Sequence, residues 1–167
     1  MKKINLFKIL WVLPIIFAIH NLEELPQLGK WAEKVLDSER LHFLRDFYSF
    51  QTLVVAMVLL TLTVGIIILL EYKVRNKITS SLTLLCTCLL LINGITHLIQ
   101  FFVYGGYVPG LITAVTLLIP YMSFILYIQI KNYDLTIKKV ILYILISVII
   151  MFPTITIFLF IANILVV

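Results

Sequence analysis

Long apolar runs separated by short polar clusters are the main pattern of this sequence. Residues 47–70 carry no charge, and residues 78–130 contain no Lys, Arg, Asp or Glu. A transmembrane helix needs about 20 predominantly apolar residues to cross ~30 Å of hydrocarbon, so the second run is too long for one span. The sequence Gly105-Gly-Tyr-Val-Pro-Gly110 is a dense turn signal, and it predicts that this run forms two helices.

We therefore predict an all-α protein with a single transmembrane domain over residues 1–167. It contains five transmembrane helices and a short interfacial helix between the first two. Charged and apolar residues are interleaved around Trp31, which is typical of a helix lying at the membrane surface. Pro26 is expected to end the first helix, and Asp37 or Ser38 to cap the start of a further one. The predicted spans are about 4–22, 47–70, 79–103, 108–130 and 140–166, and the polar segment is 27–46.

The first span also has features of a signal peptide, because Lys2 and Lys3 precede an apolar stretch of suitable length. A cleavage site needs small residues two positions apart, however, and Ala18-Ile-His20 offers only one. The sequence therefore predicts that the first span is retained.

Composition supports the membrane class. With 62% hydrophobic residues and a mean hydropathy of +1.14, the chain is more apolar than a soluble domain, which is usually about half apolar. The net charge is +5, but the basic residues flank the apolar runs instead of forming a basic face, which predicts a lipid bilayer as partner and no nucleic acid. Cys86 and Cys88 point to different sides of a helix and are expected neither to pair nor to share a metal. Frequent Ile, Leu, Lys and Asn are typical of an AT-rich bacterial source.

The basic residues also predict how the chain is oriented. With five spans, the N-terminus and the segments 71–77 and 131–139 lie on one side and hold nine of the thirteen Lys and Arg residues. The positive-inside rule places that side in the cytoplasm and the C-terminus outside the cell membrane. The first and third spans then both run outward, so His20 and His97 reach the same outer end although they are far apart in sequence.

The end of the first span concentrates ionisable residues. His20, Glu23 and Glu24 are spaced i, i+3 and i+4, so they lie on one helical face. Negative charge near a helix C-terminus is unfavourable by about 0.3–1 kcal/mol per carboxylate, and the two neighbours also repel each other. A proton or a cation should compensate them, and a divalent metal such as Zn or Fe would do so. We predict His20, Glu23, Glu24 and His97 as ligands, with Glu23 or Glu24 as a general base acting on bound water.

A second polar stripe lies on the third span. Asn93, His97, Gln100 and Tyr104 are spaced i, i+4, i+7 and i+11, again on one face. Polar side chains at this depth are costly unless they face the bundle interior, so the stripe is expected to meet the first helix. Tyr107, Gly110 and Thr113 surround the start of the next span, where free N–H groups can receive an anion or a polarised carbonyl.

Structural interpretations and other functions remain open. His20 and its carboxylates could form a helix end solvated at the headgroups, Asn93 and His97 could make interhelical hydrogen bonds, and His42 is interpreted as a surface residue. The sequence has no His-Glu-x-x-His, Gly-x-Ser-x-Gly, P-loop or dinucleotide motif. The sequence favours a metal-binding, hydrolytic protein with a small-molecule or lipid substrate. The alternatives are a small permease, a proton-coupled carrier, or a structural or lipid-interacting protein. It predicts no oligomeric state.

Three short motifs together resemble a known family. His20-Asn-Leu-Glu-Glu24 is followed by Asn93-Gly-Ile-Thr-His97 and by Tyr107-Val-Pro-Gly110-Leu-Ile-Thr113. This order resembles the HXXEE family of membrane proteins, in which the first motif accompanies Asn-x-x-x-His and Tyr-x-Pro-Gly-x-x-Thr, and the match covers about residues 10–130. The resemblance implies that the residues of the three motifs, including Pro109, recur together in the family. The function of that family is unknown, so the resemblance implies no activity for this chain. It also argues against cleavage of the first span, which would separate His20 from its partners.

Overall fold

The structure, a computed structural model, describes residues 6–36 and 49–166, and these are helical apart from short connections. The predicted all-α fold is confirmed. Among the described residues, five stretches are long and apolar enough to cross a membrane: Lys8–Trp31, Phe50–Val74, Lys77–Tyr104, Leu111–Asn132 and Ile137–Val166. The helices are α1 (Leu6–Leu10), α2 (Leu13–Leu36), α3 (Phe50–Val74), α4 (Lys77–Tyr104), α5 (Leu111–Thr113), α6 (Ile119–Asn132) and α7 (Ile137–Val166).

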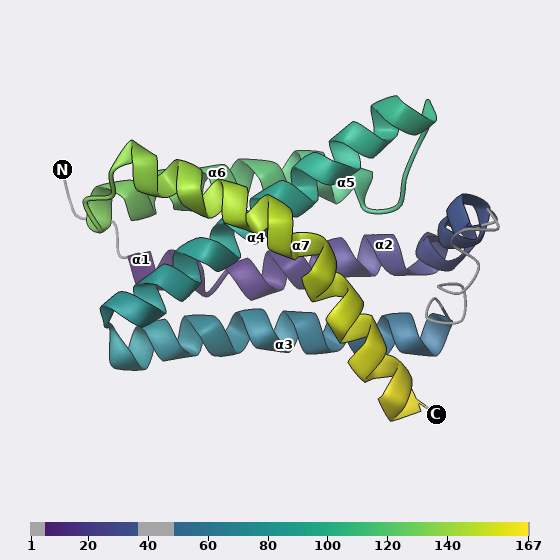
Figure 1. Cartoon of the computed structure of the whole chain (residues 1–167), viewed down its shortest axis with the longest axis horizontal. Coiled ribbons are helices and arrows are strands. Elements are labelled where there is room, and N and C mark those ends of the chain that lie inside the picture. Colours follow the sequence, from purple (N-terminus) through teal and green to yellow (C-terminus); the bar gives the residue numbers. More distant parts are fainter. Residues whose placement is uncertain (1–5, 37–48, 167) are drawn as a thin grey trace.

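The long helices alternate in direction. In Figure 1, α1, the α3–α4 turn and the α6–α7 turn lie at one end of the bundle, whereas the end of α2, the α4–α5 connection and the C-terminus lie at the other. The central helix is α4, which packs against α3, α6 and α7. Because α2 and α4 run in the same direction, the polar residues in the middle of α2 can meet those in the C-terminal half of α4.

The first span is interrupted where the sequence predicts a continuous helix. Trp11 and Val12 form a turn between α1 and α2. The cause is Pro14, which has no N–H and whose ring would clash with the carbonyl of Leu10 in a regular helix. At this break the carbonyl of Ile9 accepts hydrogen bonds from the Val12 N–H at 3.0 Å and from the Tyr121 hydroxyl at 2.9 Å, so the break is tied to α6.

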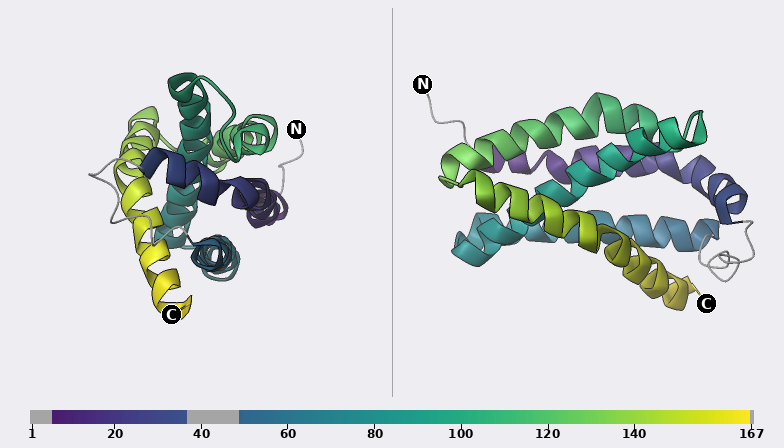
Figure 2. Two further views of the ribbon diagram at one scale, coloured as in Figure 1. Left: turned by 90° about the vertical axis from the view of Figure 1, so that its right-hand side faces the viewer. Right: turned by 45° about the horizontal axis from the view of Figure 1, so that its top comes forward.

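The prediction that Pro26 ends the first helix is wrong. Helix α2 continues through Pro26 to Leu36. A proline removes one backbone hydrogen bond and bends a helix without always ending it. Figure 2 shows the last part of α2 turned across the end of the bundle. The remainder of the predicted interfacial helix, residues 37–46 with the expected cap at Asp37 or Ser38, lies outside the described residues.

Two glycines shape the connection between α4 and α5. Gly105 ends α4 in the left-handed region at φ +67°, and its N–H donates to the Phe101 carbonyl at 3.0 Å. Gly110, at φ +82°, directly precedes α5. This helix begins at Leu111 and not near residue 108 as predicted. After Thr113 the helix widens into one π-helical segment, Ala114–Leu118, before it continues as α6. This arrangement places Gly110 and Thr113 beside α2 and α4.

Candidate metal site

The two histidine side chains of the motifs meet between α2 and α4. The ring centroids of His20 and His97 lie 4.9 Å apart in an edge-to-face arrangement, and both side chains are buried. The backbone of Gly110 closes the site on one side. A Cβ atom built on Gly110 would lie 2.8 Å from Cε1 of His20 and 3.1 Å from Cε1 of His97. Only glycine leaves room for both rings, which gives the Pro-Gly turn a direct role in the site.

The hydrogen bonds around His20 determine its tautomer. Its Nδ1 lies 2.9 Å from the hydroxyl oxygen of Thr113, and that hydroxyl donates its single proton to the carboxylate of Glu23. The Thr113 oxygen must therefore accept a hydrogen bond from Nδ1–H of His20. The proton on Nδ1 leaves a lone pair on Nε2, which is buried and has no hydrogen-bond partner within the described residues. An imidazole held in this way is oriented for metal binding through Nε2.

Glu24 faces both imidazoles. One of its oxygens lies 4.0 Å from Nε2 of His20, and the other lies 3.9 Å from Nε2 of His97. These separations are too long for hydrogen bonds. One ligand atom from each of the three residues can be chosen so that all lie within 4.8 Å of one another. Tetrahedral Zn²⁺ ligands at about 2.1 Å from the ion lie about 3.4 Å apart, so a contraction of up to about 1.4 Å would allow all three to bind one ion.

Glu23 has a different environment, although the sequence predicts both carboxylates as ligands. Its oxygens accept hydrogen bonds from the Tyr107 hydroxyl at 2.8 Å, from the N–H of Ile112 at 3.1 Å and from the N–H of Thr113 at 2.7 Å, besides the Thr113 hydroxyl. The carboxylate therefore occupies the N-terminus of α5, where negative charge is favourable. The N–H groups expected to receive a ligand are thus used by the protein's own Glu23, and only Glu24 faces the imidazoles.

Tyr107 is held as a hydrogen-bond donor. Removal from water, followed by its hydrogen bond to the Glu23 carboxylate, raises the pKa of Tyr107 to about 12. Both effects disfavour the phenolate, which would lie next to another anion. At neutral pH the hydroxyl consequently stays protonated and binds Glu23.

The rest of the second stripe lines a cavity of about 480 Å³ between α2, α3, α4 and α7. Asn93, Gln100 and Tyr104 contribute to its wall together with Glu24 and His97. Oδ1 of Asn93 is buried and has no partner within the described ranges. The ring of Tyr104 packs edge-to-face on Trp31, with centroids 5.6 Å apart. These residues therefore share the wall of one cavity with Glu24 and His97.

Sequence reasoning missed Asn21, which also lines the cavity. Its amide donates to the Thr61 hydroxyl at 3.0 Å and joins α2 to α3. The signal was its position three residues before Glu24, on the same face of the helix.

A second buried polar cluster at the opposite end was missed as well. Glu71 is buried and accepts hydrogen bonds from the hydroxyls of Tyr133 at 2.7 Å and Ser80 at 3.0 Å. This carboxylate directly follows an apolar span, so the sequence suggests a solvated helix end. The cluster instead connects α3, α4 and the α6–α7 turn. Burial and the hydrogen bond to Glu71 raise the pKa of Tyr133 well above its usual range.

Residues 11–125 match the family described as "Protein of unknown function with HXXEE motif". The match covers most of the chain and all three motifs, so the chain belongs to the HXXEE family, as the resemblance predicts. No curated protein and no solved structure matches the chain.

Proposed function

We propose that this member of the HXXEE family is a membrane-embedded metal-binding protein whose ligands are His20, Glu24 and His97. The observation that supports the proposal best is the environment of His20. Its Nδ1–H is committed to Thr113, and its free Nε2 is buried opposite a carboxylate and a second imidazole. A buried polar atom without a partner costs about 1–3 kcal/mol, and a cation shared by the three groups would remove that cost.

The donor set favours Zn²⁺ or Fe²⁺. Two histidines and one carboxylate form the site of several hydrolytic zinc enzymes, which keep a further coordination position open for water or substrate. The same set is also found in non-haem iron proteins. The metal would supply a Lewis acid for hydrolysis of a small-molecule or lipid substrate. Glu24 lines the cavity and supplies the carboxylate ligand, whereas the oxygens of Glu23 are already held by four hydrogen bonds.

We place the protein in the cell membrane with its N-terminus in the cytoplasm. Of the nine Lys and Arg residues that the structure describes, seven lie at the end of the bundle that contains α1 and the α3–α4 and α6–α7 turns, which favours the cytoplasmic side. His20, Glu24 and His97 then lie near the outer face. The lipid bilayer is the expected partner, and the dispersed basic residues argue against nucleic acid.

Orientation can be tested with a cysteine at Gly106 and an impermeant thiol reagent. A Cβ at Gly106 meets nothing within 4 Å, and its backbone is not in the left-handed region, unlike that of Gly105. Native Cys86 and Cys88 are buried, so background labelling should be low. The proposal expects Gly106→Cys to react in intact cells. Reaction only after lysis would reverse the orientation.

Metal analysis of the purified protein tests the site itself. We expect one equivalent of Zn or Fe, which is lost in His20→Ala and in His97→Ala. The matched control is His42→Ala, because His42 is the remaining histidine of the chain and the sequence predicts it at the surface. Absence of metal from the wild type, or unchanged metal content in both site variants, would show that these residues do not share an ion.

A further inference from the structure

The cavity beside the candidate metal site is long, and its ionisable and amide side chains lie toward one end. On α4 its lining extends from Leu82 to Tyr104, which is about 33 Å along a helix at 1.5 Å per residue. On α4 the polar lining residues run from Asn93 to Tyr104, about 17 Å, and Asn21 and Glu24 of α2 also line the cavity. From Asn93 the lining continues for about 17 Å toward Leu82 and is mainly apolar.

Threonines in the lining do not add polarity to the cavity. The hydroxyl of Thr63 donates to the Leu59 carbonyl at 2.8 Å, and that of Thr154 donates to the Ile150 carbonyl at 2.7 Å. Thr96 is tied in the same way to the carbonyl of Ile92 at 2.8 Å. A hydroxyl that bonds back to its own helix is satisfied locally. The cavity is therefore amphipathic, with one polar band and one apolar extension.

The helix arrangement explains the extension. Helices α3 and α4 lie close together at their connecting turn and diverge toward the other end, while α7 crosses both (Figure 1). The lining residues come from these three helices and from α2. One end of the space thus lies toward the α3–α4 turn, and its other end contains Glu24 and His97.

We propose that this cavity binds a neutral single-chain lipid, with its ester or amide carbonyl at Glu24 and His97 and its acyl chain directed toward Leu82. This inference rests on the proposed function and names the substrate class of the same site. The apolar extension from Asn93 to Leu82 is about 17 Å, slightly more than one leaflet of hydrocarbon, about 15 Å, so an acyl chain can be accommodated.

The head group, and not the chain, should determine which lipid binds. Lipid tails in a bilayer are already in apolar surroundings, so moving one into an apolar cavity gains little free energy. In the part of the chain that the structure describes, no lysine or arginine lines the cavity. A phosphate would lack a cationic side chain there, whereas a carbonyl can be bound by amide groups such as Asn93 and Gln100 and by the metal. A neutral ester or amide therefore fits better than a phospholipid.

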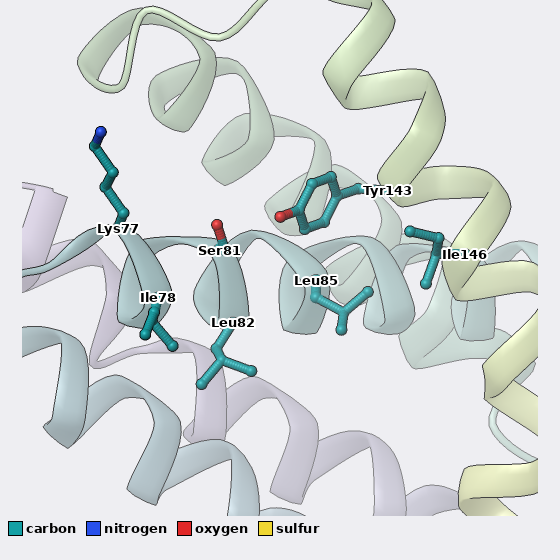
Figure 3. Close-up of a pocket in the computed structure, with 7 residues that line it drawn as sticks. All are labelled: Lys77, Ile78, Ser81, Leu82, Leu85, Tyr143 and Ile146. Carbon is teal, nitrogen blue, oxygen red and sulfur yellow. The ribbon is translucent and has the colours of Figure 1, made fainter.

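A second, shallower groove provides an internal control. It shares Leu82 and Leu85 with the cavity but lies on another side of α4, where Lys77, Tyr143 and Ile146 line it (Figure 3). Ile146 contributes to this groove and not to the cavity. A large side chain at Ile146 should leave the cavity open, whereas the same change at Leu89 or Leu60, on opposite walls of the cavity, should fill it.

Photolabelling of the full-length protein in lipid nanodiscs tests the inference. The probe is a long-chain monoacylglycerol with a diazirine in the middle of its chain, and the comparison probe is a phosphatidylcholine with the same modified chain. Labelled peptides are identified by mass spectrometry, and the metal content of each sample is measured in parallel. We expect the monoacylglycerol to label the segment around Leu85–Leu90 and an excess of the unmodified ester to prevent labelling.

The variants then determine whether the cavity is the binding site. Leu89→Trp and Leu60→Trp should each reduce labelling by about tenfold, the ratio that a steric cost of ~1.4 kcal/mol produces, with metal content unchanged. Ile146→Trp should label like the wild type. Equal labelling of this segment by the phosphatidylcholine, or unchanged labelling in both cavity variants, would overturn the inference while leaving the metal site intact. Specific labelling of a protein without metal would support the lipid site and refute the proposed function.

Discussion

Alanine at position 110 should damage the metal site more than the fold. Gly110 combines two constraints, a left-handed backbone at φ +82° and direct contact with both histidine rings. A Cβ there would lie 2.8 Å from Cε1 of His20 and 3.1 Å from Cε1 of His97. Carbon atoms in favourable contact are about 3.5–4.0 Å apart, so the ring of His20 would have to withdraw by about 0.7 Å.

The two constraints have separable magnitudes. The left-handed conformation costs a residue with a Cβ about 1–2 kcal/mol, which should appear as lower stability. Displacement of the ring affects the metal, because functional groups must be held within about 0.5 Å of their productive geometry. Disturbing the groups that orient metal ligands typically costs about 10–100-fold in affinity, and we expect a loss in this range for Gly110→Ala.

Gly105→Ala is the matched control, because Gly105 is also left-handed, at φ +67°, but a Cβ there meets nothing within 4 Å. Both variants should lose similar stability in thermal unfolding, and only Gly110→Ala should lose metal affinity in a titration against a competing chromophoric chelator. Equal metal affinities for the two variants would refute the assignment of Gly110 to the wall of a metal site.

Three further predictions test neighbouring contacts. Thr113→Val removes the partner of His20 Nδ1 and should lower metal affinity by about 10–100-fold. Thr116→Val should not, because the Thr116 hydroxyl donates to the carbonyl of its own helix at 2.7 Å. Equal metal affinities of the two variants would contradict the tautomer assigned to His20. In an ultraviolet titration, one tyrosine should ionise near pH 12, and this step should be absent in Tyr107→Phe. In Glu23→Gln the pKa of Tyr107 should move toward 10, because the neighbouring anion is gone. Because the pKa of Tyr107 is raised in the folded state, the stability that its hydrogen bond contributes is complete below pH 10 and is lost as the pH rises toward 12. If neither variant changes the titration curve, the step near pH 12 does not belong to Tyr107. Tyr133→Phe leaves buried Glu71 with one hydrogen-bond donor fewer and should lower the free energy of unfolding by about 1–3 kcal/mol without changing metal content. The same change at exposed Tyr127 should have little effect. Equal stabilities of the two variants would show that the Glu71 cluster is not structural.

The apolar pattern was sufficient to predict the number of long helices, because each must cover its backbone within a stretch of apolar side chains. Alternating direction then predicted that His20 and His97 lie at the same level. The proline effects were less predictable. Pro14 interrupts the first span and Pro26 does not, although the same local rule applies to both. The hydroxyl of Tyr121, distant in sequence, satisfies the carbonyl of Ile9 at the first break.

The separate roles of Glu23 and Glu24 could not be derived from spacing alone. Both lie on the same broad face as His20, at i+3 and i+4, and differ by about 100° around the helix. Which one faces α4 depends on how α2 is rotated in the bundle, and that rotation is set by packing. Their neighbouring positions suggested a shared ion, whereas the structure pairs one with backbone N–H groups and the other with imidazoles.

This division gives the His-x-x-Glu-Glu spacing a physical explanation. The glutamate at i+4 faces the imidazoles directly. The glutamate at i+3 binds the start of the next span and accepts the proton of the Thr113 hydroxyl, which in turn accepts Nδ1–H of His20. A carboxylate, a hydroxyl and an imidazole thus form a chain that fixes the tautomer of a ligand, as carboxylates do directly in many zinc sites. The motif needs both acids because one faces the site and the other keeps the histidine oriented toward it.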